Sequence, residues 1–329
     1  MLAGPRSQRV LAAVIAALGL WSVAPLLAWV YNLGPFALWF WLTAVPGFVF
    51  MAAVAVFYDR RGGHRDLMFA LSSGVIGGII ATLIYDVVRM PFLVAGYRLF
   101  APVNSYGILM TGSITGSPFT DTLGWFYNFL NGTGFGIAYA MIALGRKWWW
   151  AIPFALGLET MTIVPLYADV YGLRGHLDVI AIAYGAHVFY GAALGKIVEQ
   201  AGRWRSLEDS PLPAWWIMVG MAAVLVAMGH PWTTPSYLSV AAGLSPQPAA
   251  VVRSGAFQPE WMRVGVGGCV VLDNRDGAAY HLGAPAGAAV LAAHSRATYC
   301  FPKSGIQRIQ LNKVPYSGGW VIVDPAKKR

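Results

Sequence analysis

The residues best suited to chemistry in this chain are ionisable side chains embedded in long apolar runs. Asp86 lies late in one run, Glu159 lies near the middle of another, and His187 lies early in a third. Carboxylates combined with an imidazole can relay protons or bind Zn, Fe or Cu. One hypothesis is therefore that Asp86, Glu159 and His187 line a metal or proton pathway that is open to the outer side of a membrane.

The same residues also have a purely structural explanation. Arg89 follows Asp86 at i,i+3, so the two can form an ion pair on one helix face. Glu159 and His187 can then satisfy each other or a backbone carbonyl. A charge exposed to lipid at the bilayer centre costs about 2.5–3.5 kcal/mol or more. Either arrangement therefore requires the side chains to face the interior of a bundle, and no fixed metal-ligand spacing decides between the two.

The composition sets the class of protein. Of the 329 residues, 57% are hydrophobic and 11% are charged, against about 25% charged in soluble domains. This excludes a purely soluble or a disordered protein, and two cysteines exclude a disulfide scaffold. The formal net charge is +9, but no basic stripe interleaved with aromatics accompanies it, so we expect no nucleic-acid partner. An α-helical polytopic membrane protein with a small soluble domain remains.

Seven segments are long and apolar enough, or nearly so, to cross a bilayer. They are 10–30, 36–57, 67–90, 123–144, 148–167, 179–198 and 214–229. We therefore predict a seven-span transmembrane domain over 1–230. The first segment is interpreted as a retained span, because its apolar run is too long for a signal peptide.

Arginine and lysine cluster in alternate connections between these segments, which predicts the orientation. Ten lie on one side, among them Arg60, Arg61 and the Arg146-Lys147 pair, against two or three on the other. The positive-inside rule then puts the amino terminus in the cytoplasm and the carboxyl-terminal domain outside. The Trp148-Trp149-Trp150 run beside Lys147 is typical of an interfacial belt. We expect a bacterial inner-membrane protein with a periplasmic domain.

Several predicted spans carry glycines at helical spacing. The pairs are Gly74 with Gly78, Gly132 with Gly136, and Gly191 with Gly195. Small residues at this spacing allow close approach of helix backbones in lipid; the alternative is a glycine-lined ligand cavity. The stretch 98–122, rich in Gly, Ser and Thr, is expected to be an outer loop.

The composition changes after Gly229. A Pro-rich linker over 231–249 leads into 250–329, where short strands alternate with turn residues. The predicted strands are 251–257, 261–266, 269–273, 279–282, 288–292, 296–301, 306–311 and 319–323. Eight short strands in such a stretch indicate a β-sandwich.

Particular residues of this domain carry a family resemblance. Phe257-x-Pro259, Val264, Gly268, Val270-Val271-Leu272-x-Asn274-x-Asp276 and His281 resemble the first half of a cupredoxin, the plastocyanin and azurin fold. Phe301, Gly305 and the closing Gly318-Gly319-Trp320-Val321-Ile322-Val323 resemble its second half. The membrane part resembles small bacterial inner-membrane proteins with Gly-rich helices and a His-x-x-Tyr-Gly segment, here His187 to Gly191. That second resemblance implies no activity.

Members of the family that this domain resembles bind a copper ion, and this chain lacks most of the residues that bind it. The family binds copper through an early His and then a Cys, a His and usually a Met in the last loop. His281 is the remnant of the early His, whereas Leu311 stands at the Cys position and Ser317 at the Met position, with no His between them. A blue-copper centre requires a thiolate and two imidazoles. The resemblance therefore implies a degenerate cupredoxin without blue copper.

Both cysteines belong to this domain. An oxidising compartment favours a disulfide between Cys269 and Cys300, and in a cupredoxin-like fold the two lie on neighbouring strands. Two free buried thiols are the alternative. A different, exposed copper site formed by Met262, His281 and His294 is a further alternative.

Three functions follow from these patterns. The first is a non-catalytic accessory subunit of a bacterial membrane complex, which docks on other membrane subunits through its bundle and its copper-free domain. The second is a transporter or handling protein for a metal or for protons that uses Asp86, Glu159 and His187. A membrane enzyme ranks last, because no nucleophile–base constellation or phosphate loop is present. The expected partners are other membrane subunits and the lipid bilayer, and the one candidate cofactor is a transition metal such as Cu or Zn.

Overall fold

The computed structural model describes residues 6–31, 33–61, 65–95, 97, 99–113, 116–163, 177–204, 249–253, 255–258, 260–283, 289–311 and 318–324. The chain divides into two compact units. The first comprises Met1–Ala95, Phe126–Tyr167 and Gly175–Ala227; the second comprises Gly96–Trp125, Ala168–Arg174 and Met228–Arg329.

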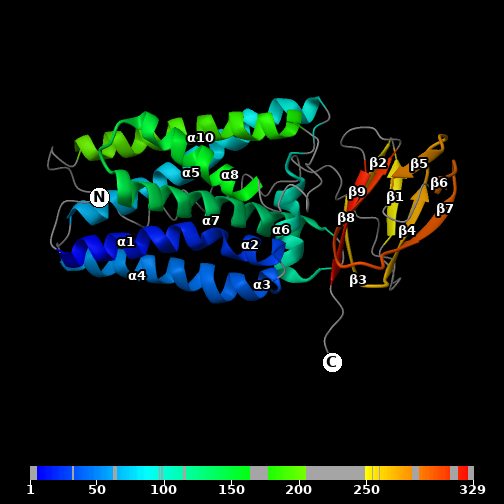
Figure 1. The fold of residues 1–329 in the computed structure, drawn as a ribbon, viewed down its shortest axis with the longest axis horizontal. Helices are drawn as coiled ribbons and strands as arrows, with labels where there is room; N and C mark the ends of the chain where they lie inside the picture. Colours follow the sequence, from blue (N-terminus) through cyan, green and yellow to red (C-terminus); the bar gives the residue numbers. More distant parts are fainter. Residues whose placement is uncertain are drawn as a thin grey trace. The chain divides into compact units, whose positions relative to one another are not determined.

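Most of the first unit is helical, and its long helices run alongside one another (Figure 1). A first helical stretch joins α1, η1 and α2, and a second joins α3, the π-helical η2 and α4. The described helices of the chain are α1 (Arg6–Leu20), η1 (Trp21–Val23), α2 (Ala24–Val30), α3 (Phe36–Trp39), η2 (Phe40–Ala44), α4 (Val45–Arg61), α5 (Arg65–Val94), α6 (Ala101–Thr111), α7 (Pro118–Ala143), η3 (Trp148–Trp150), α8 (Ala151–Thr162) and α10 (Leu177–Trp204). Of these, α6 and the start of α7 belong to the second unit.

Within the described residues, four helical segments are long and apolar enough to cross a membrane. They are Ser7–Val30, Phe36–Tyr58, Arg65–Leu93 and Leu177–Arg203, and they coincide with four of the seven predicted spans. Helix α7 has sufficient length, but Asn128, Asn131 and Thr133 lower its hydropathy. The total of seven spans is therefore not confirmed.

Three other expectations differ from the structure or lie outside it. The predicted span 148–167 begins as the short η3 and continues as the 12-residue α8. The predicted loop over 98–122 contains a helix, α6, which starts with Pro102 in its first turn and ends at Gly112 in a left-handed conformation with φ 68°. These are helix start and stop residues that outweigh the polar composition of the stretch. The predicted span 214–229 lies outside the described residues.

Glycines bring α5 and α7 into backbone contact. A Cβ atom at Gly78 would lie 2.5 Å from the carbonyl oxygen of Gly132, and Gly136 faces Gly74 and Gly78 equally closely. Tyr190 of α10 donates a hydrogen bond to the carbonyl of Gly132 at 2.8 Å. The predicted glycine pairs thus serve close helix packing, which places polar side chains of α5, α7 and α10 within reach of one another.

The β part of the second unit forms two sheets. One has the order β2-β1-β4-β7 and the other the order β3-β9-β8-β5-β6; β1 pairs parallel to β4, and β3 parallel to β9. The strands are β1 (Ala249–Arg253), β2 (Ala256–Gln258), β3 (Trp261–Gly265), β4 (Cys269–Asn274), β5 (Tyr280–Gly283), β6 (Ala289–Leu291), β7 (Arg296–Cys300), β8 (Gly305–Leu311) and β9 (Gly318–Asp324).

Alternating side chains from both sheets form one apolar core. It contains Val252, Phe257, Val270, Leu272, Leu282, Leu291, Ile309, Leu311 and Val321 among others. The single strand predicted over 251–257 is in fact two, because the chain turns at Gly255 with φ 69°. Otherwise each predicted strand has a counterpart in these sheets.

The cysteines of the β part lie opposite each other on two adjacent strands. Cys269 of β4 is the register partner of Cys300 of β7, and their sulfur atoms are 2.03 Å apart, at disulfide distance. The predicted pairing is therefore present, and the alternative of two free thiols does not apply.

Candidate functional site

Four helices of the first unit contribute to a buried polar network. Tyr85, Asp86 and Arg89 lie on α5, Asn128 on α7, Glu159 on α8 and His187 on α10. An apolar cluster of the same four helices, including Ala81, Ala155 and Tyr190, packs against Tyr85 of this network. The surrounding apolar packing explains why these polar groups must satisfy one another rather than water.

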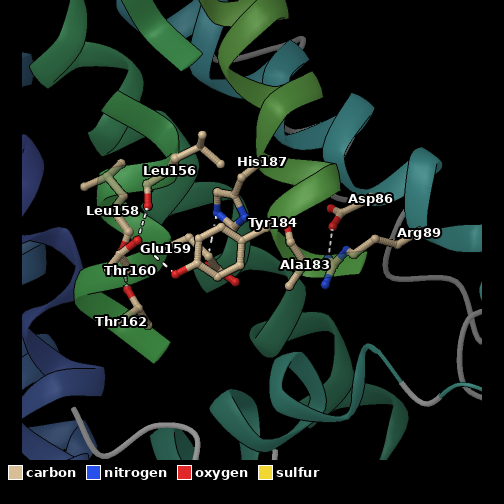
Figure 2. A network of polar contacts seen from close by, with 10 residues as sticks. All are labelled: Asp86, Arg89, Leu156, Leu158, Glu159, Thr160, Thr162, Ala183, Tyr184 and His187. Atoms are coloured by element: carbon tan, nitrogen blue, oxygen red, sulfur yellow. Dashed lines mark hydrogen bonds and ion pairs between the residues drawn. The ribbon is translucent and has the colours of Figure 1, made fainter. Parts of the chain in front are cut away.

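Asp86 and Arg89 form an ion pair one helical turn apart, as the sequence predicts (Figure 2). The side chain of Asp86 is completely buried, and that of Arg89 is 7% exposed. The second carboxylate oxygen of Asp86 accepts a hydrogen bond from Asn128 Nδ2 at 3.1 Å. Asp86 is thus held on both of its oxygens, which suits a fixed anion that balances Arg89.

His187 and Glu159 form the second predicted pair. Nε2 of His187 lies 3.4 Å from Oε2 of Glu159, and their side chains are 16% and 10% exposed. Nδ1 of His187 lies 2.9 Å from the carbonyl oxygen of Ala183. The structure therefore brings Glu159 and His187 together, whereas Asp86 is engaged by Arg89 and Asn128 instead.

Tyr85 connects the two pairs. The Arg89 guanidinium carbon lies 3.9 Å from the centre of the Tyr85 ring, and the His187 ring meets the same ring edge-on at 4.6 Å. Glu159 is also close enough to Arg89 for an electrostatic attraction. The result is a continuous path of contacts from Asn128 through Asp86, Arg89, Tyr85 and His187 to Glu159.

A hydroxyl pair lies next to this path. Tyr184, one turn before His187 on α10, shares a hydrogen bond with Thr160 of α8 at 2.9 Å (Figure 2). Thr160 directly follows Glu159, so the two contacts fix α8 against α10 at adjacent positions. Because this hydroxyl pair is exposed whereas Asp86 is not, it marks the more accessible end of the network.

The hydrogen-bond partners of His187 define its protonation chemistry. A carbonyl oxygen only accepts hydrogen bonds, so Nδ1 must carry the hydrogen that faces Ala183. Nε2, on the other side of the ring, lies 3.4 Å from Oε2 of Glu159, where an imidazole that carries a second proton would form an ion pair with the carboxylate.

The β part shows no comparable cluster in the residues described. There, as in the described helices, no group of three His, Cys, Asp or Glu side chains is placed to hold a metal ion. His281 on β5 is exposed, and Leu311, at the position of the family's Cys, is buried in the core. The Met and His positions of the last loop, including Ser317, fall in residues 312–317, outside the described residues.

The alternative exposed copper site does not form as predicted. Met262 is completely buried and belongs to the apolar core, whereas His281 and His294 are exposed. The prediction of a metal at Asp86, Glu159 and His187 is not tested by these contacts, and it stays a prediction.

Sequence reasoning missed three members of the network: Tyr85, Asn128 and Tyr184. Tyr85 precedes Asp86 and lies four residues before Arg89, a spacing that places its ring and the guanidinium on one helix face. Asn128 is a polar residue in an otherwise apolar segment, and this was the available signal. The contact of Tyr184 with Thr160 depends on the packing of α8 on α10, which the sequence does not specify.

Comparisons with known proteins concern the β part. No protein-family model matches the chain, and no curated protein matches it. Among solved structures, the chain is similar to a reduced amicyanin mutant at 17% identity, over 24% of this chain and 83% of that chain, with a TM-score of 0.22. It is also similar to a purple cupredoxin from Nitrosopumilus maritimus at 16% identity, over 24% of this chain and all 100% of that chain, with a TM-score of 0.22. An oxidized amicyanin mutant aligns at 16% identity over 24% and 84% of the two chains, with the same TM-score of 0.22.

Proposed function

We propose that this chain is a membrane protein that handles protons through the His187–Glu159 pair. The observation that carries the proposal is the contact between Nε2 of His187 and Oε2 of Glu159, which are 3.4 Å apart inside the helical unit. Ionisable groups inside apolar helices are costly and typically mark ion or proton paths. Imidazole is the side chain that most readily exchanges protons near neutral pH.

The remaining contacts support a division of roles. Asp86 and Arg89 form a buried pair of fixed charges, and Asn128 holds the carboxylate. His187 and Glu159 are less buried, with side chains that are 16% and 10% exposed, so in this proposal protons enter and leave there. Tyr85, which touches both Arg89 and His187, links the fixed charge to the exchanging pair.

Proton flux in reconstituted vesicles tests this function. The full chain is placed in proteoliposomes with an entrapped pH-sensitive dye, and a pH gradient is applied with the membrane potential clamped. We expect wild-type flux above that of empty vesicles and a loss of about 100-fold or more in His187→Gln and Glu159→Gln, since a positioned proton-transfer group contributes about 10²–10⁴-fold. His281→Gln, which changes an exposed imidazole of the β part, is the matched control.

Each outcome has a meaning. Wild-type flux equal to that of empty vesicles contradicts the proposal, as does full flux in both variants. The same vesicles loaded with a Zn- or Cu-sensitive dye test the metal alternative, in which Asp86, Glu159 and His187 would pass a transition metal. Metal flux without proton flux would favour that alternative.

An accessory, non-catalytic role remains the second candidate. Large apolar side chains are exposed on α3, η2 and α4, among them Leu38, Trp41, Leu42 and Val49. These faces suit lipid or the helices of other membrane subunits. Purification at native expression in mild detergent tests this role, and a lone monodisperse monomer would contradict it.

The proposal includes an orientation. We propose that the chain crosses a bacterial inner membrane seven times, with its amino terminus in the cytoplasm and the β part outside. The asymmetric distribution of Lys and Arg supports this orientation, as does the cysteine pair at disulfide distance. Protease protection in spheroplasts checks it. Digestion of the β part only after the inner membrane is broken would reverse the orientation.

A further inference from the structure

A second polar site lies at one end of the helical unit, where α7 turns into η3. The turn lies directly on α10: a Cβ atom at Gly195 would overlap the carbonyl oxygen of Trp148, and a Cβ at Gly191 would lie 2.6 Å from the carbonyl oxygen of Ala151. The candidate span on α10 ends at Arg203. The turn therefore packs near one end of a candidate membrane-spanning segment, where Trp, Lys and Arg side chains are typical of a membrane interface.

Glu199 of α10 organises this turn. Its Oε2 accepts a hydrogen bond from the backbone N–H of Trp148 at 3.0 Å. Its Oε1 accepts one from Arg203 at 2.7 Å and lies 3.8 Å from Lys147 Nζ. One buried carboxylate thereby fixes the first residue of η3 and gathers two cations around it.

Cations outnumber anions in this cluster, which also contains exposed tryptophan rings. Lys147 and Arg203 are 69% and 63% exposed, Lys196 lies over the Trp148 ring at 4.9 Å, and Arg146 is exposed as well. Trp149 and Trp150 stack at 4.5 Å and are 47% and 51% exposed. Among the described residues, this cluster has four cations and one carboxylate, that of Glu199.

We propose that this cluster, formed by Arg146, Lys147, Lys196, Arg203 and Trp148–Trp150, binds the headgroup of an anionic phospholipid. The ammonium group of lysine and the guanidinium group of arginine are positively charged hydrogen-bond donors, so they complement the negatively charged phosphodiester of a lipid headgroup. The stacked indoles provide an amphipathic surface for the glycerol and upper acyl region. A free phosphate would use only the cations, whereas the exposed rings require an occupant with an apolar part.

The test measures lipid preference on the full-length protein in detergent. Thermal unfolding is recorded while phosphatidylglycerol or phosphatidylcholine with identical acyl chains is added, with inorganic phosphate as a third arm. We expect the wild type to bind phosphatidylglycerol in preference to phosphatidylcholine. Each lysine near a membrane surface contributes about 1 kcal/mol, so Lys147→Gln with Lys196→Gln should reduce the preference by roughly 25-fold.

Lys147 and Lys196 are chosen because neither donates the hydrogen bond between the backbone of Trp148 and Glu199. Their own contacts with Glu199 and Trp148 can lower the unfolding temperature in both lipids alike, so the difference between the two lipids in the same variant separates a lost lipid site from a weakened fold. Lys303→Gln, in the β part, is the control for charge alone. Trp149→Ala with Trp150→Ala should weaken binding of phosphatidylglycerol and leave any effect of phosphate unchanged.

Three results would overturn the proposal. The first is equal stabilisation of the wild type by the two lipids. The second is an unchanged preference in the double lysine variant that still folds. The third is stabilisation by inorganic phosphate alone at the same concentrations, which would indicate an ordinary anion effect. None of these depends on whether the His187–Glu159 pair moves protons.

Discussion

His187 packs edge-on against Tyr85, with the two ring centres 4.6 Å apart. The guanidinium group of Arg89 lies over the same ring, with its carbon atom 3.9 Å from the ring centre. An aromatic ring attracts a cation over its face and accepts a neighbouring ring at its edge or face. One side chain therefore connects the Asp86–Arg89 ion pair on α5 with the Glu159–His187 pair formed by α8 and α10.

Replacing Tyr85 by Leu should weaken this connection. Loss of a partly buried cation–π contact costs about 1–2 kcal/mol, so the thermal unfolding temperature of the full chain should fall and proton flux should decrease. Tyr85→Phe keeps the ring and should behave like the wild type in both measurements. A Leu variant as stable and active as the Phe variant would show that the ring connects nothing.

Removing Asp86 should be more damaging than removing the whole ion pair. Asp86→Asn leaves Arg89 buried without its anion, which costs about 3–5 kcal/mol. The double variant Asp86→Leu with Arg89→Met removes both charges and should recover much of the stability. Denaturant unfolding in detergent measures both. Equal losses in the single and double variants would contradict the ion-pair argument.

Gly78→Ala should destabilise the helical unit. Its Cβ would lie 2.5 Å from the carbonyl oxygen of Gly132, and overpacking of this kind costs about 1–3 kcal/mol. Gly157→Ala is the matched control, because nothing lies within 4 Å of a Cβ there; in a helix it should be neutral or stabilise by about 0.5–1 kcal/mol. The ranking of the two unfolding temperatures checks the prediction.

Loss of the cystine should destabilise the β part. The cysteines are 31 residues apart in sequence, and closing a loop of that size contributes about 3–4 kcal/mol in the chain-entropy model. Cys269→Ala with Cys300→Ala should therefore become protease-sensitive within the β part at a lower temperature than the wild type. Thiol labelling before and after reduction of the wild type supplies the control, since labelling without reductant would mean that no disulfide forms.

Acid should weaken the β part through Asp273. The hydrogen bond from Arg296, at 3.2 Å, and the second cation Arg275 hold the pKa of this carboxyl below its usual value, although partial burial opposes them. The pKa of Asp273 is lower in the folded state than in the unfolded state, where it is near 3.9. The contacts with Arg296 and Arg275 therefore stabilise the fold above about pH 3.9, and this stabilisation is lost as the pH falls through the folded-state pKa. Asp273→Asn should flatten the decline in stability below about pH 4, measured by thermal unfolding across pH.

Patterns of polarity predicted much of this fold. The apolar runs at 36–57, 67–90 and 179–198 correspond to helices, because burial of an apolar face determines them. Period-two alternation, as in Val270 and Leu272, likewise predicted the strands. The helix α6 was missed, because its composition is that of a loop and only Pro102 and Gly112 mark its ends.

Pairing across the site was predictable only in part. The spacing of Asp86 and Arg89 predicts their contact, because one helix fixes it. The meeting of Glu159 with His187 was one of two expectations, since it depends on how α8 packs on α10. Tyr85 contacts His187 of α10, and Glu199 accepts a hydrogen bond from the backbone of Trp148. Both contacts join residues far apart in sequence and depend on how the helices pack, which the composition does not specify.

The bridge between Cys269 and Cys300 ties β7, the last strand in the order β2-β1-β4-β7, to its inner neighbour. An outer strand is the part of a sandwich most able to detach and to pair with another molecule. A covalent link at that position keeps the strand in its own sheet even during transient opening, and it thereby protects the protein from strand exchange between copies crowded in the same membrane.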